Sequence, residues 1–136
     1  MLSKALITVC VLFYAVGSPI VEVNSSHVFN PDWTPHVRIH EVWQLITNSS
    51  IGFIVLWLIW IEKRVVLGAA ISLAVMGSFI VAYALQDLYG GSMKFLNGSE
   101  NLVFGINFGL LVSSSIVITL LLAIYIETKT QTKPSA

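Results

Sequence analysis

The chain alternates long apolar runs with short polar segments, and this pattern predicts four helices that cross a membrane. A bilayer core needs about 20 apolar residues per helix. Runs of that length cover residues 5–23, 36–61, 65–85 and 102–126. We therefore expect an all-α fold: one integral membrane four-helix bundle over residues 1–126, followed by a polar cytoplasmic tail over residues 127–136.

The composition supports lipid as the main solvent of this chain. Of its 136 residues, 56% are hydrophobic and 10% are charged, whereas soluble domains carry about 25% charged residues. The net charge is zero, so the chain lacks the basic footprint of a nucleic-acid-binding protein. The single cysteine, Cys10, excludes an intramolecular disulfide.

The first apolar run also fits a cleaved signal peptide, because Lys4 precedes it and small residues lead up to Ser18. Against cleavage, Pro19 would directly follow the cut, and the apolar run continues to Val23. A retained first helix is the favoured interpretation.

The distribution of lysine and arginine predicts the orientation of the bundle. With four spans, five cations share the side of the termini and only Arg38 and Lys94 lie on the other; the five are Lys4, Lys63, Arg64, Lys129 and Lys133. The positive-inside rule then places both termini in the cytoplasm. Glycosylation sequons at Asn24 and Asn97 fall in the two outer loops. The sequence is compatible with several membranes, including the endoplasmic reticulum, the plasma membrane and a bacterial inner membrane.

Small residues repeat at every fourth position in the third and fourth runs. The repeats are Ala70, Ala74, Ser78 and Ala82 in the third run, and Gly105, Gly109 and Ser113 in the fourth. Because close packing through small residues drives helix association in lipid, we expect these two ridges to meet.

Polar residues concentrate between positions 27 and 44, which include all three histidines. Thr34 followed by Pro35 is typical of a helix start. On a helix from there, four polar residues spaced by four line one face: His36, His40, Gln44 and Asn48. Unpaired polar groups are costly in lipid, so we expect this stripe to face the bundle interior and line a pocket that opens outward. Other candidates for the pocket are Asn30, Asp32, Trp33, Asp87 and Asn107.

Three interpretations of this segment compete. In the first, His36 and His40 bind a divalent metal (zinc, iron or copper), with His27 or a carboxylate as a further ligand. In the second, His36, His40 and Glu41 act as acid and base on a sterol-like or terpenoid substrate. In the third, the residues contact membrane lipids in a structural subunit of a larger membrane complex. The leading interpretation is an outward-facing site that binds a metal or an apolar, lipid-like small molecule.

The run from His27 through Asn30-Pro31, Trp33, Pro35-His36 and on to His40 resembles a motif in a group of small four-span membrane proteins from bacteria and fungi. The resemblance covers the first third of the chain by motif and the remainder by hydropathy alone. It implies that these residues form one functional unit, but it implies no reaction. The sterol-isomerase pattern of His and Glu one helical turn apart is not reproduced here.

Overall fold

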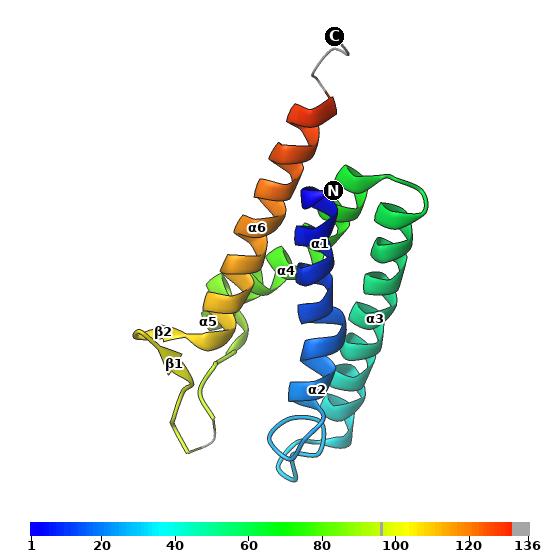
Figure 1. The fold of residues 1–136 in the computed structure, drawn as a ribbon. Helices are drawn as coiled ribbons and strands as arrows, with labels where there is room; N and C mark the ends of the chain where they lie inside the picture. Colours follow the sequence, from blue (N-terminus) through cyan, green and yellow to red (C-terminus); the bar gives the residue numbers. More distant parts are fainter. Residues whose placement is uncertain (96, 132–136) are drawn as a thin grey trace.

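The computed structural model of the protein, described over residues 1–95 and 97–131, is dominated by four long helical segments (Figure 1). The first combines α1 (Leu2–Leu12), the π-helical turn η1 (Phe13–Gly17) and α2 (Ser18–Glu22). The others are α3 (Pro35–Trp60), α4 (Val65–Ala84) and α6 (Phe108–Gln131). All four are long and apolar enough to cross a membrane. The predicted all-α, multi-pass membrane bundle is confirmed.

The two ends of the bundle differ in their loops and charges. The N-terminus, the turn between α3 and α4, and the C-terminal end of α6 share one end, and the two long loops share the other (Figure 1). The second long loop contains the short helix α5 (Gln86–Tyr89) and a hairpin of β1 (Leu102–Val103) and β2 (Ile106–Asn107). Within the described residues, the termini end carries Lys4, Lys63, Arg64 and Lys129, whereas Lys133 lies outside the described residues.

Helix α1 lies at the centre of the packing and contacts α3, α4 and α6. The core it shares with them is made of fully buried aliphatic side chains, among them Ile7, Val55, Ile59 and Leu120. Within this core, the hydroxyls of Tyr14 and Ser72 form a hydrogen bond at 3.1 Å, and both residues are buried. A polar pair that satisfies itself inside an apolar bundle fixes how η1 and α4 align, because either hydroxyl alone would be left unpaired.

Polar contacts also close the bundle at the termini end. The Ser3 hydroxyl donates to the Glu127 carboxylate, and the Trp60 indole donates to Thr8 at 3.1 Å. Helix α6 continues to Gln131, so the first part of the expected tail is helical; residues 132–136 lie outside the described residues.

The fourth helix begins later than expected, at Phe108 rather than residue 102. Phe104 and Gly105 both adopt positive φ angles of 54° and 77°, as tight hairpin turns require. These angles are incompatible with a right-handed helix. The side-chain oxygen of Asn107 then accepts from the backbone N–H of Leu110 at 3.2 Å, which supports the start of α6.

The predicted meeting of two small-residue ridges is wrong, although α4 does pack against α6. Ala70, Ala74, Ser78 and Ala82 all lie on the exposed face of α4, and Gly105 is in the hairpin turn. The face that α4 buries carries Gly68, Ala69 and Ser72 instead.

Two glycines outside those ridges lie in very close contact with a neighbouring helix. A Cβ atom built on Gly52 of α3 would lie 2.3 Å from the Cβ of Ala15, and one on Gly68 would lie 2.5 Å from a methyl of Ile59. Small residues therefore do set the helix spacing, as expected in lipid. They do so where α3 contacts the first span and α4, and not between the two predicted ridges.

We predict that Gly52→Ala lowers the thermal stability of the protein in detergent. The added methyl would force α3 away from the first span, and overpacking of this kind costs about 1–3 kcal/mol. Gly77→Ala is the matched control, because a Cβ there meets nothing within 4 Å and gains about 0.5–1 kcal/mol of helix stability. Equal melting temperatures for the two variants would contradict this close approach.

Candidate functional site

The loop between α2 and α3, residues 23–34, is folded by its own polar side chains. The side-chain oxygen of Asn24 accepts from the backbone N–H and the hydroxyl of Ser26, both at 2.7 Å. The Asn30 amide donates to the Ser26 carbonyl at 3.1 Å, and its oxygen accepts from the N–H of Asp32 at 3.0 Å. The loop is thus a defined structure with its own hydrogen-bond network.

Arg38 fastens this loop to the first turns of α3. Its guanidinium group donates to the carbonyl of Asn30 at 2.8 Å and to that of Pro31 at 3.4 Å. Thr34 caps the same helix by accepting from the N–H of Val37 at 3.3 Å, as the Thr-Pro pair predicted. Arg38 therefore donates its hydrogen bonds to the loop backbone and forms no ion pair with Glu41 in the described structure.

His27 lies at the centre of a group of polar side chains that we call the loop cluster: Glu22, Ser26, His27 and Glu41. The Nε2 atom of His27 lies 3.0 Å from the Glu22 carboxylate, and its Nδ1 atom lies 2.8 Å from the Ser26 hydroxyl. Glu41 is close enough to Glu22 for their charges to interact. The edge of the His27 ring meets the Trp33 ring with centroids 5.9 Å apart.

His36 and His40 form a separate pair on α3. Their Nε2 atoms are 3.1 Å apart, and the two rings meet edge to face. The expectation that the polar stripe faces the bundle interior is wrong: His36, His40 and Gln44 are exposed and Asn48 is half-buried. The face that α3 buries instead carries Leu45, Gly52, Val55, Leu58 and Ile59, because the close approach at Gly52 determines which side turns inward.

The proposed metal ligands are therefore not assembled. His27 belongs to the loop cluster, away from the His36–His40 pair. Over residues 1–95 and 97–131, no group of three or more His, Cys, Asp or Glu side chains is placed to hold a metal ion. A metal at His36 and His40 would thus find no third His, Cys, Asp or Glu ligand among the described residues.

The other predicted pocket residues are dispersed. Asn107 is buried and donates to Glu100 at 2.9 Å, and Asp87 is exposed on α5. Gln44, Asn48, Asp87 and Asn107 make no hydrogen bond to the loop cluster within the described residues. Of the predicted pocket residues, Asn30, Asp32 and Trp33 do lie beside it.

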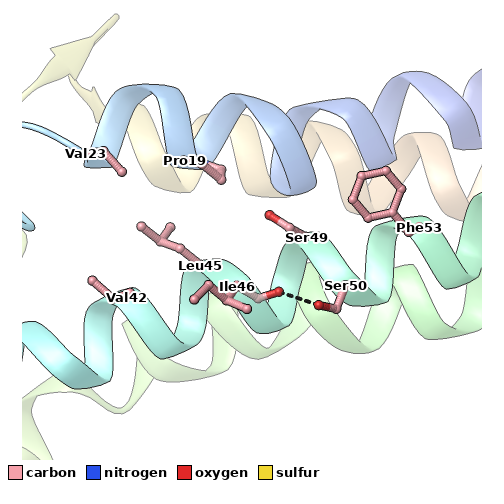
Figure 2. A pocket seen from close by; sticks show the side chains of 8 residues that line it. All are labelled: Pro19, Val23, Val42, Leu45, Ile46, Ser49, Ser50 and Phe53. Carbon is pink, nitrogen blue, oxygen red and sulfur yellow. Dashed lines mark hydrogen bonds between the residues drawn. The ribbon is translucent and has the colours of Figure 1, made fainter.

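An apolar groove of about 270 Å³ runs between α2 and α3 (Figure 2). Its lining residues are Pro19, Val23, Val42, Leu45, Ile46, Ser49, Ser50 and Phe53. The two hydroxyls are already occupied: Ser49 donates to the Ala15 carbonyl at 2.7 Å, and Ser50 donates to the Ile46 carbonyl at 2.8 Å. A ligand in the groove therefore meets an essentially apolar wall.

The groove and the loop cluster are adjacent through the chain itself. Glu22 directly precedes the lining residue Val23, and Glu41 directly precedes Val42. Two carboxylates thus lie at the loop end of an open apolar groove.

Glu22 is the functional candidate that the sequence analysis missed. It was counted within the first apolar run, where a single carboxylate does not change the hydropathy pattern. An ionisable residue inside a membrane span is by default a functional candidate, and that signal could have identified it.

Comparisons with protein-family models, with curated proteins and with solved structures found no match for this chain.

We predict that Arg38→Gln increases hydrogen–deuterium exchange in residues 24–33 and leaves exchange in the transmembrane helices unchanged. The substitution removes the donor that holds the Asn30 and Pro31 carbonyls, and charged hydrogen bonds of this type contribute about 1.5–3 kcal/mol. His36→Gln on the same exposed helix end is the control and should leave the loop protected. Identical exchange in the two variants would show that Arg38 does not fasten the loop.

Proposed function

We propose that this small polytopic membrane protein binds a lipid-like small molecule, with an apolar chain in the groove between α2 and α3 and a polar head group at the loop cluster. The observation that carries this proposal is the position of Glu22 and Glu41, each one residue from the groove lining. The apolar chain of an amphiphile in the groove would contact apolar side chains, and its polar head group would reach the hydrogen-bonding groups of the loop cluster.

The size and chemistry of the groove favour a slender ligand. Its volume of about 270 Å³ is near the lower end of ordinary ligand pockets, about 300–1,000 Å³. A chain that leaves lipid for this groove gains little from the hydrophobic effect, because lipid is equally apolar. Selectivity must therefore come from shape and from the loop cluster, where His27 and the two carboxylates supply acceptors, donors and charge.

We predict that Ile46→Trp blocks the groove and reduces photo-crosslinking of a diazirine-bearing long-chain alcohol to the detergent-purified protein. Ile46 lines the groove and is 61% exposed, so the larger ring fills the opening without entering the core. An overpacking cost of about 1–3 kcal/mol corresponds to roughly a 5- to 150-fold loss of affinity.

Ile118→Trp on α6 is the matched control, because Ile118 is 66% exposed and lies on another helix. Crosslinks in the wild type should map to residues 19–23 and 42–53. Unchanged crosslinking in Ile46→Trp would contradict the proposal. A chain that cannot be purified folded without another protein would instead support the subunit interpretation.

We also propose that the loop cluster faces away from the cytoplasm, on the basis of the cations gathered at the termini end. The expected result is that translation with eukaryotic microsomes adds a glycan at Asn97, and that Asn97→Gln abolishes it. Asn48→Gln is the control, because the third sequon of the chain, Asn48-Ser49-Ser50, lies inside α3. Labelling of a Gln131→Cys variant only from the outer side would overturn this orientation.

A further inference from the structure

We propose that Ser26, His27 and Glu22 form a relay that activates the Ser26 hydroxyl as a nucleophile toward carboxylic esters. The three side chains are joined in sequence: Ser26 Oγ lies 2.8 Å from His27 Nδ1, and His27 Nε2 lies 3.0 Å from Glu22 Oε2. A nucleophile, a base and an acid that orients the base are the parts that activate a serine in enzymes.

The pairing with Glu22 determines which proton His27 carries. An ionised carboxylate only accepts hydrogen bonds, so neutral His27 donates to it from Nε2. The Nδ1 atom is then the free acceptor, and it faces the Ser26 hydroxyl. As Nδ1 takes the hydroxyl proton, Glu22 stabilises the imidazolium that forms. In the serine-protease triad, Nε2 faces the serine and Nδ1 faces the carboxylate; here the two nitrogens have the opposite partners. Catalytic triads are recognised by the roles and geometry of their groups, so this exchange is compatible with the same chemistry.

Asn24 holds the serine oxygen in position. Its side-chain oxygen lies 2.7 Å from both Ser26 Oγ and the Ser26 backbone nitrogen. The hydroxyl therefore has two acceptors, Asn24 Oδ1 and His27 Nδ1, and its proton moves between them by rotation while the oxygen stays in place. A fixed oxygen with a mobile proton is the geometry that a nucleophile needs.

The relay is open to substrate on its serine side and sheltered on its acid side. Ser26 is exposed and lines a shallow pocket of about 530 Å³ shared with the second long loop, where Asn97 and Ser99 lie. The side chains of His27 and Glu22 are only 33% and 28% exposed. An ester carbonyl can therefore reach Ser26 from this pocket while lower exposure strengthens the His27–Glu22 contact.

The reaction is hydrolysis of an ester in two steps. Ser26 Oγ bonds to the carbonyl carbon and its proton passes to His27; the ester C–O bond breaks, and the leaving alcohol takes that proton. Water then bonds to the acyl carbon and gives one proton to His27. The acyl–Oγ bond breaks, Ser26 Oγ takes that proton back from His27, and the carboxylic acid leaves. This inference rests on the proposed function for the source of the ester, an acyl amphiphile held in the groove.

The test is labelling of the detergent-purified full-length protein by a small ethyl fluorophosphonate probe, read by intact mass and peptide mapping. We expect one label per chain, on Ser26, and none on Ser26→Ala. His27→Gln should label roughly a hundredfold more slowly, since general-base catalysis contributes about 10²–10⁴-fold. Ser25→Ala is the control and should label like the wild type, because Ser25 makes no side-chain hydrogen bond within the described residues.

Absence of labelling in folded wild-type protein, or a labelling rate unaffected by His27→Gln, would overturn the relay. Hydrogen–deuterium exchange over residues 24–33 shows whether each variant keeps the loop folded. The short ethyl chain of the probe does not need the groove, so its result is independent of the long-chain alcohol crosslinking. Crosslinking of the long-chain alcohol without labelling of Ser26 would overturn the relay and support the proposed function. Labelling of Ser26 without crosslinking would support the relay and contradict lipid binding in the groove.

Discussion

The structure depends on one backbone carbonyl in the first span, that of Ala15. Pro19 has no N–H to offer the carbonyl four residues before it, and no water is present in lipid to replace that donor. The first span turns π-helical over Phe13–Gly17 just before the proline, and the Ser49 hydroxyl of α3 donates to Ala15 at 2.7 Å. This hydrogen bond fixes the rotation of α3 beside the first span, together with the close approach of Gly52 to Ala15.

That rotation decides the chemistry available at the loop end of the bundle. It buries Leu45, Val55 and Ile59 and leaves His36 and His40 on the outside. It also leaves the groove between α2 and α3, with Pro19 and Ser49 facing each other across it (Figure 2). Because the chain leaves α2 at Glu22 and returns through a tightly bonded loop, a carboxylate, a histidine and a serine come together at the loop end of the groove.

Helix packing in this bundle relies on small residues, but only a few of the small residues lie in helix–helix contacts. A repeat of small residues identifies a smooth face, and smooth faces can turn toward lipid as readily as toward a neighbour; the exposed Ala70–Ala82 row of α4 is an example. Gly68 differs because Ile59 occupies the space above it. That distinction depends on the partner helix, so spacing within one helix cannot reveal it.

The sequence by itself determined the solvent, the number of spans, the helix start at Thr34-Pro35 and the sharing of one end by both termini, because hydropathy, length and capping act locally along the chain. It also placed His27, Asn30, Asp32 and Trp33 in one polar segment, which the structure folds as a single hydrogen-bonded loop. Only the tertiary structure decided which face of α3 turns inward and which histidine meets Glu22. Those outcomes depend on a hydrogen bond and a close contact between residues more than thirty positions apart, and a periodic pattern within a single helix carries no information about its partner.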